Sequence, residues 1–359
     1  MKKKIILFIP SIESGGVEKN LFLISEYLIK KKFSTYIVTA NANYKNKFDK
    51  KIKVICPNSN KWIDRKRILK TLVSILLLIK NFYNKDTIIL SFQSNILAIL
   101  SSKILNSKII IRLNTSVKKY INGYFSETFY RFFYNLSDEI VVNSIFFKKE
   151  LKGNLKLDST LIYNSYKPNF IKKKLDFFKN YQGLKIINIG RLTDQKDQIT
   201  LLKSLNLLMK NKINFKCCII GAGVKKTFLN NYVQSNNLKN FVKLIGYKKN
   251  AENYLSCCDL FVLSSKFEGL PNVLIEAQSK NIPIISSDCP TGPKEILLNG
   301  KLGDLFRVGN YKKLSELIKN FKLDKKRLIK KSKNAKKNLI RFNLKINCEK
   351  YLKIISKYQ

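Results

Sequence analysis

The sequence predicts an α/β fold made of two doubly wound domains that face each other across a cleft. Short apolar runs alternate with longer amphipathic ones, as in βαβ units that build parallel sheets. The alternation forms two series, in a chain whose 359 residues exceed the usual size of a single core. Hydrophobic residues make up 45% of the chain, so both halves can bury a core.

Each series provides six candidate strands. In the first half they cover residues 4–9, 35–39, 51–55, 87–92, 108–112 and 139–143. In the second half they cover residues 185–189, 215–220, 241–245, 259–263, 282–286 and 302–306. Apolar residues at helical spacing predict a helix over 17–31, another is expected over about 197–210, and the Lys-rich tail 324–359 favours one or two amphipathic helices.

The stretch between the two series is polar and rich in turn residues, which is typical of an interdomain linker. We therefore predict an N-terminal domain over 1–165, a linker over 166–183 and a C-terminal domain over 184–340. A final helix over 341–359 is expected to pack back on the N-terminal domain. Ligands of open parallel sheets bind at the carboxyl ends of the strands, so the site is expected there.

Composition excludes several kinds of chemistry. The chain has no histidine, which removes His-based triads, general bases and metal ligands. Its seven cysteines are odd in number and form no CxxC, so reduced thiols in a cytoplasmic protein are expected. The apolar run at 75–79 is too short to span a bilayer, and the amino terminus does not resemble a signal peptide. The sequence contains neither a DxD pair nor a P-loop motif.

The formal charge of +45 comes mainly from lysines that are spread along the whole chain. A nucleic-acid-binding surface would instead concentrate Arg and Lys on one element with stacking aromatics. The excess charge favours anionic surfaces such as phospholipid headgroups, at about 1 kcal/mol per well-placed cation.

The most specific pattern follows the candidate strand at 259–263. Pro271 is expected at the first position of a helix, where proline is favoured, and Leu270 at the cap, where it offers no side-chain oxygen. The amides of Asn272 and Val273 would then suit a phosphate.

Two carboxylates flank this helix start. Glu268 lies just before the helix and Glu276 roughly a turn and a half inside it, so they can reach different parts of one ligand. An ordinary proline-initiated helix with two exposed glutamates fits the spacing equally well.

Cations and glycines mark two further strand ends. Gly190, Arg191 and Lys196 follow the first strand of the second series, where a guanidinium fork and an ammonium can neutralise a diphosphate. Gly15-Gly16 follows the first strand of the chain and would let a backbone approach a ligand, although a tight turn needs no ligand. The Gly-Ala-Gly at 221–223 lacks the third glycine and the acidic residue of a dinucleotide site, so it is predicted to be a turn.

Together these motifs resemble the retaining GT-B glycosyltransferases of family 4, the glycosyl transferases group 1. The segment 288–296 also resembles one that is common among members building bacterial surface polysaccharides and lipid-linked oligosaccharides. The matching set is Gly15-Gly16, Gly190-Arg191 with Lys196 (the family's GR-x4-K), and Glu268 and Glu276 separated by seven residues (its EX7E).

The resemblance implies roles for the matching residues. Arg191 and Lys196 would hold the donor diphosphate, Glu276 would bond the nucleotide ribose, and Glu268 would contact hydroxyls of the transferred sugar. The backbone around the helix start would meet the phosphate, and the Gly-Gly turn would approach the donor from the acceptor domain. These backbone positions are Gly190, Gly269, Leu270, Asn272 and Val273 in the donor domain, and Gly15 and Gly16 in the acceptor domain.

The implied function is transfer of a hexose-type sugar from a nucleotide-diphosphate sugar, with UDP as the default, to a saccharide or undecaprenyl-linked acceptor in surface glycan synthesis. The N-terminal domain would bind the acceptor and the C-terminal domain the donor, without a cofactor or metal. Many relatives carry a histidine near the reacting sugar, which this chain cannot. In a front-face mechanism the departing phosphate oxygen takes the acceptor's proton, so no side-chain base is needed.

Two segments suggest a peripheral location on the inner face of the plasma membrane. Residues 61–80 predict a basic, apolar-faced helix that includes the only tryptophan and could lie on an anionic bilayer. The aromatic segment 120–134 could contact a lipid-linked acceptor. Both segments could instead pack onto the first sheet, which is the preferred interpretation for the aromatic one.

Two other functions remain as alternatives. A nucleotide-sugar epimerase or phosphorylase of the same fold would usually need histidines or a cofactor lysine pattern that is missing here. A non-catalytic polyanion- or nucleic-acid-binding protein would bind any polyanion in a salt-sensitive way, without preference for a nucleotide sugar.

Overall fold

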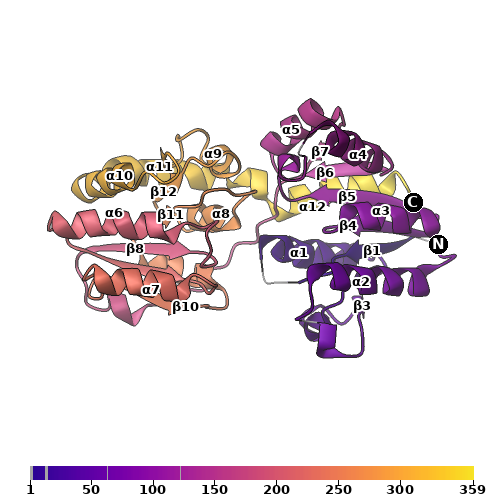
Figure 1. Cartoon of the computed structure of the whole chain (residues 1–359), viewed down its shortest axis with the longest axis horizontal. Helices are drawn as coiled ribbons and strands as arrows, with labels where there is room; N and C mark the ends of the chain where they lie inside the picture. Colours follow the sequence, from indigo (N-terminus) through magenta and orange to yellow (C-terminus); the bar gives the residue numbers. More distant parts are fainter. Residues whose placement is uncertain (1–2, 13–14, 63, 122) are drawn as a thin grey trace. The chain divides into compact units, whose positions relative to one another are not determined.

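The computed structural model describes residues 3–12, 15–62, 64–121 and 123–359 and divides the chain into two compact units (Figure 1). The first unit combines Met1–Lys167 with Phe342–Gln359, and the second unit is Pro168–Arg341. Each unit is built on one parallel sheet. The predicted α/β class with two doubly wound sheets is therefore confirmed.

The sheet of the first unit has the strand order β3-β2-β1-β4-β5-β6-β7. Its strands are β1 (Lys4–Phe8), β2 (Thr35–Val38), β3 (Lys53–Ile55), β4 (Thr87–Ser91), β5 (Lys108–Leu113), β6 (Glu139–Val142) and β7 (Thr160–Leu161). The central strands are apolar almost throughout because helices cover both faces of a parallel sheet. Only β7 was not predicted, since its two residues carry no recognisable pattern.

Helices cover the two faces of this sheet unequally. Helices α1 (Gly16–Lys30) and α12 (Leu344–Ser356) share one buried cluster with Ile5 and Leu7 of β1. The other face is covered by α2 (Arg67–Phe82), α3 (Asn95–Ile104), α4 (Tyr124–Asn135) and α5 (Ile145–Leu155). Successive residues of a strand point to opposite faces, so Ile6 and Phe8 of β1 belong to this second cluster.

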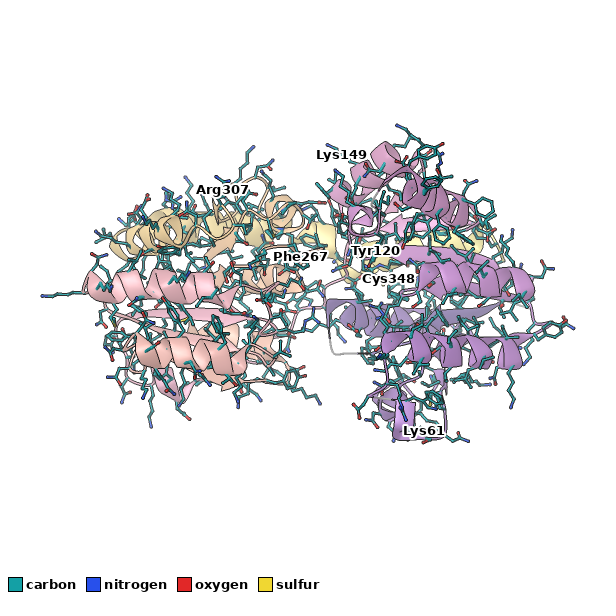
Figure 2. The ribbon with its side chains drawn as sticks, in the orientation of Figure 1. Lys61, Tyr120, Lys149, Phe267, Arg307 and Cys348 are labelled. Carbon is teal, nitrogen blue, oxygen red and sulfur yellow. The ribbon has the colours of Figure 1, made fainter. Side chains whose placement is uncertain are left out.

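The C-terminal helix α12 is anchored in the first unit by both apolar and polar contacts. Its residues Cys348 (labelled in Figure 2) and Tyr351 are buried in the cluster with α1. The Glu349 carboxylate accepts a hydrogen bond from the Tyr27 hydroxyl at 2.6 Å and pairs with the Lys31 ammonium at 2.7 Å. Helix α12 therefore belongs to the same folded unit as β1 and α1.

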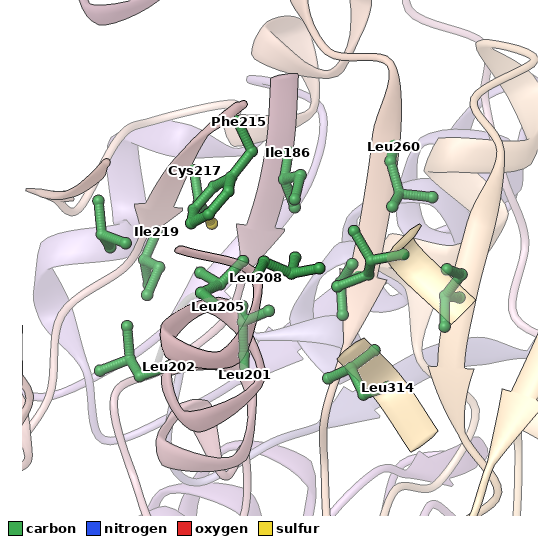
Figure 3. Packing of buried hydrophobic residues seen from close by; sticks show 14 of the residues in the cluster. Ile186, Leu201, Leu202, Leu205, Leu208, Phe215, Cys217, Ile219, Leu260 and Leu314 are labelled. Carbon is green, nitrogen blue, oxygen red and sulfur yellow. The ribbon is translucent and has the colours of Figure 1, made fainter. Parts of the chain in front are cut away.

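The sheet of the second unit has the strand order β10-β9-β8-β11-β12-β13. Its strands are β8 (Leu184–Ile189), β9 (Phe215–Ile220), β10 (Val242–Gly246), β11 (Leu260–Leu263), β12 (Ile284–Ser287) and β13 (Asp304–Phe306). Its helices are α6 (Gln198–Lys210), α7 (Lys226–Ser235), α8 (Asn272–Ser279), α9 (Pro293–Ile296), α10 (Tyr311–Leu323) and α11 (Lys326–Lys337). Figure 3 shows its main core, in which Leu201, Leu205 and Leu208 of α6 lie near Ile186 of β8 and Phe215 of β9.

Two helical predictions in the first unit need correction. The helix expected over 61–80 begins at Arg67, because Asn60–Trp62 form a separate 3-10 turn; residue 63 lies outside the described residues. The aromatic segment 120–134 was expected to pack onto the sheet, but in α4 only Tyr134 is fully buried, whereas Phe125 is 90% exposed. None of the helices in the described part of the chain combines the length and apolar character needed to cross a bilayer.

Candidate functional site

The candidate site lies at the point where the strand order of the second sheet changes direction. Strands β8 and β11 pair in parallel at the centre, with β9 and β10 on one side and β12 and β13 on the other. The loops that follow β8 and β11, residues 190–197 and 264–271, are therefore neighbours at the carboxyl edge. This edge is where open parallel sheets bind their ligands.

An ion pair joins the two loops. The Lys196 ammonium lies 2.5 Å from Glu268 Oε1, and the two side chains are only 15% and 6% exposed. The Ser265 hydroxyl donates a second hydrogen bond to the same carboxylate oxygen at 2.5 Å. A carboxylate and an ammonium that were predicted from separate motifs thus form one buried ion pair at the carboxyl edge of the sheet.

Further hydrogen bonds fix the backbone of these loops. The Ser264 hydroxyl donates to the Lys196 carbonyl at 3.1 Å, and the Lys266 amide donates to the Gln195 carbonyl at 2.8 Å. The Gln195 side-chain amide donates to the carbonyl of Phe267 at 3.0 Å. Sequence reasoning missed Ser264 and Ser265, although two adjacent serines at the end of an apolar strand are a usable signal for buried hydroxyls.

Arg191 is the exposed cation of the site. Its guanidinium makes a long hydrogen bond of 3.4 Å to Gln195 Oε1, and its carbonyl accepts from the Gln198 side chain at 2.9 Å. Within the described residues no carboxylate forms an ion pair with it. Its backbone is fixed while its charged group remains accessible to an anion.

Close backbone contact holds the loop that carries Gly190. The amide of Gly190 donates to the Ile220 carbonyl at 3.0 Å, and that of Leu192 to the Ala222 carbonyl at 2.9 Å. A Cβ atom on Gly221 would lie 1.8 Å from the Gly190 oxygen. The turn predicted at 221–223 therefore also supports the neighbouring loop, which a side chain there would displace.

The start of α8 differs by one residue from the prediction. Pro271 occupies the cap position and Asn272 is the first helical residue, so Leu270 is not the cap but a buried residue before it. Proline satisfies this position because its extended backbone leads into the helix and it needs no amide partner. Asn272 and Val273 still supply the first backbone amides of the helix.

Both glutamates of the motif are buried. Counted over the whole residue, Glu268 is 9% exposed and Glu276, on α8, is 6% exposed. The alternative of an ordinary helix with two exposed glutamates is therefore wrong. Buried carboxylates require partners, which for Glu268 are Lys196 and Ser265.

The segment after β12 contacts the backbone of the turn at Glu268 and Gly269, which precedes α8. The Thr291 hydroxyl donates to the Glu268 carbonyl, and a Cβ atom on Gly292 would lie 2.0 Å from the carbonyl oxygen of Gly269. Gly292 also has a φ of +35°, which favours glycine. Burial, and next the charge of Glu268, raises the pKa of the adjacent Cys289 to about 12, so this thiol is neutral.

The Gly15-Gly16 turn belongs to the first unit. The Gly15 amide donates to the Glu18 carboxylate at 2.9 Å, and the Gly16 carbonyl accepts from the Asn20 side chain at 3.0 Å. Ser14, the residue before this turn, lies outside the described residues. Over the part of the chain that the structure describes, no three Cys, Asp or Glu side chains gather closely enough to hold a metal ion.

Comparison with known proteins relates this site to one family. The family model described as glycosyl transferases group 1 matches residues 170–338, which include every predicted site residue of the second unit. The "Uncharacterized glycosyltransferase MJ1059" of Methanocaldococcus jannaschii is 34% identical over 254 residues, which cover 64% of this chain and 62% of that protein.

A second relative has a more specific name. The "N-acetylgalactosamine-N,N'-diacetylbacillosaminyl-diphospho-undecaprenol 4-alpha-N-acetylgalactosaminyltransferase" of Campylobacter jejuni is 31% identical over 152 residues, 42% of this chain and 40% of that protein. Among solved structures, Anabaena Alr3699/HepE in complex with UDP aligns with 99% of this chain and all of that chain, at a TM-score of 0.80 and 18% identity.

Proposed function

Because residues 170–338 match the family of glycosyl transferases group 1, we propose that the chain transfers a hexose-type sugar from a nucleotide-diphosphate sugar with retention of configuration. The observation that supports this function best is the buried Lys196–Glu268 pair beside the exposed Arg191, at the carboxyl edge between two central strands. Cations can neutralise the charge of a diphosphate, and a carboxylate beside them can accept hydrogen bonds from the hydroxyls of the attached sugar.

The proposed donor site uses each group for one task. Arg191 would grip the diphosphate as a fork and Lys196 as a point charge, and the amides at the start of α8 would meet its oxygens. Lys196 has three N–H donors, so it can keep Glu268 and still bind a phosphate oxygen. Glu268 would then accept hydrogen bonds from the sugar hydroxyls and Glu276 from the ribose.

Transfer itself would exchange two bonds at the anomeric carbon. The bond from this carbon to the β-phosphate oxygen breaks while the acceptor oxygen bonds from the same face, and the acceptor's proton passes to the departing phosphate oxygen. The chain has no histidine to serve as a base, and this route needs none. Arg191, Lys196 and the helix start would stabilise the negative charge that grows on the diphosphate.

UDP is the proposed nucleotide, since the similar Anabaena protein was solved with it. The proposed acceptor is a saccharide, free or carried on a polyprenyl diphosphate, as the name of the Campylobacter relative states for that protein. Seven free cysteines, most of them buried, agree with a reducing compartment, and we place the reaction in the cytoplasm in surface glycan synthesis.

The test is thermal stability of the whole chain with UDP, GDP or ADP in the presence of EDTA. UDP should raise the unfolding temperature most, and Arg191→Ala and Glu276→Ala should each abolish the shift. Lys319→Ala, which removes an exposed cation from α10, should keep it. Equal shifts with every nucleotide and with inorganic polyphosphate would contradict the proposal and favour the polyanion-binding alternative.

A further inference from the structure

Three consecutive helices of the first unit carry exposed apolar side chains on their outer sides in addition to those that they bury. Helix α2 buries Leu78 and Phe82 against the sheet, yet Ile68, Leu72 and Leu76 are exposed, Leu76 by 67%. A helix that only covers a sheet buries its apolar stripe and exposes its polar one. The outward stripe of α2 is therefore not explained by the core of the unit.

Helix α3 likewise buries Ile99 in the core but also carries exposed apolar residues. Ser101 and Ser102 face inward and bond to the carbonyls of Leu97 and Ile99, so their burial leaves neither hydroxyl unsatisfied. Ile104, the last residue of α3, is 59% exposed.

Helix α4 extends the pattern with aromatic rings. Tyr134 is buried against the sheet, while Tyr124, Phe125, Phe129 and Phe132 are exposed. Because α2 packs beside α3 and α3 beside α4, the exposed side chains belong to one layer of helices over one face of the sheet. Exposed apolar side chains that gather on neighbouring elements usually mark an interaction site.

The surroundings of this layer are strongly basic. Between Lys61 and Ser137 the sequence has thirteen Lys and Arg residues but three Asp and Glu residues. Lys61 (labelled in Figure 2), Arg65, Lys66 and Arg67 are all exposed at the amino end of α2. A partner that covers the layer must therefore be both apolar and anionic.

We propose that the outer faces of α2, α3 and α4 form a docking surface for an anionic lipid bilayer. The aliphatic and aromatic side chains would enter the boundary between headgroups and acyl chains, and the cations at the start of α2 would meet phosphate groups. A second copy of this chain fits less well, since its charge of +45 would repel its partner. This inference adds a location to the proposed function. It rests on the proposed function in one respect, which is that a lipid-linked acceptor would lie at the bilayer surface.

Binding to vesicles of phosphatidylcholine, alone or mixed with phosphatidylglycerol, tests the proposal with the full chain. At low salt we expect binding to the anionic vesicles that is at least about tenfold tighter than to the neutral ones and that weakens in high salt. Leu72→Gln with Leu76→Gln, and separately Phe125→Ser with Phe132→Ser, should each weaken it about tenfold. Val224→Ser with Phe228→Ser removes two exposed apolar side chains from the second unit and should leave binding unchanged.

The single tryptophan gives a readout of depth. Trp62 lies beside the basic cluster, with the Lys61 ammonium 5.6 Å from its ring centre, and brominated lipids should quench its fluorescence in anionic vesicles. Arg65→Glu with Lys66→Glu should abolish this quenching at the same lipid concentration.

Two results would overturn the proposal: equal binding to neutral and anionic vesicles, or variants of α2 and α4 that bind as the wild type does. If these variants instead abolish self-association seen by light scattering and leave vesicle binding intact, the surface joins two copies and the bilayer is excluded. The UDP-induced thermal shift should persist in all of them, because the donor residues are in the second unit. Loss of vesicle binding and failure of the donor site are thus separate outcomes.

Discussion

Lys196 and Glu268, which lie 72 positions apart in the chain, form a buried ion pair of 2.5 Å that connects the loops after β8 and β11. Removing one partner of such a pair leaves the other charged and without compensation in a poorly solvated place. The pair is therefore expected to matter for stability as well as for binding of the donor.

Lys196→Met should lower the free energy of unfolding by about 3 kcal/mol, because Glu268 would remain buried after losing the ammonium that pairs with it. The double variant Lys196→Met with Glu268→Gln should recover at least half of that loss. Calorimetry of the wild type, both single variants and the double variant measures the coupling between the two residues. Strictly additive losses would show that the pair does not act as a unit.

Glu268→Gln should separate donor binding from transfer. The amide oxygen can still accept the hydrogen bond from Ser265, so the turn should keep its geometry, while Lys196 loses its counter-charge and stays available to the diphosphate. Transfer should fall by about 10- to 100-fold through loss of a charged hydrogen bond to the sugar, whereas UDP affinity should be kept or increased. Titration calorimetry with UDP measures the affinity, and a transfer assay measures the rate. Glu316→Gln on the surface of α10 is the control for both measurements.

Gly292→Ala should destabilise the turn before α8. The added Cβ would lie 2.0 Å from the Gly269 carbonyl oxygen, so the backbone that presents Glu268 must move. Gly309→Ala is a matched control, because Gly309 also has a positive φ but nothing lies within 4 Å of its Cβ position. We expect a greater loss of thermal stability in the first variant, by about 1–3 kcal/mol, together with loss of the UDP-induced shift. Similar losses in both would assign the effect to φ alone.

Asp304 should make the second unit sensitive to acid. Burial alone would raise the pKa of its carboxyl, but the hydrogen bonds and charges of Arg327 and Lys331 outweigh burial and lower the pKa below its usual value. A lowered pKa gives stability that is present above the unfolded-state value of about 3.9 and is lost as the pH falls through the folded value. The difference in melting temperature between the wild type and Asp304→Asn should therefore be largest near neutral pH and shrink in acid. A difference that grows as the pH falls would reverse this sign.

Much of the fold follows from the sequence because its strands are buried on both faces. Runs such as β1 and β11 are apolar at nearly every position, so they stand out without knowledge of their partners. A periodic stripe on a helix is different. It predicts α2 and α4 as amphipathic, but it cannot say how many apolar residues the sheet covers, and in these helices part of the apolar surface is exposed although Leu78, Phe82 and Tyr134 are buried.

The site was predictable to the extent that it follows strand ends. Arg191, Lys196 and Glu268 come directly after candidate strands, and parallel strands bring their ends to one edge. The contacts of Gly221 and Gly292 could not be foreseen in this way, because each depends on how closely two loops approach that are distant in sequence. The cap of α8 was misplaced by one residue, since proline suits both the cap and the first helical position.

The position of α12 has a consequence for synthesis of the protein. The second unit is one continuous stretch of chain, whereas the first unit needs Cys348, Tyr351 and the other buried residues of the last helix to complete its core. During translation the second unit can therefore close on itself as soon as it leaves the ribosome. The first unit, although it emerges earlier, must wait until α12 has been synthesised, and in that interval part of its core is uncovered.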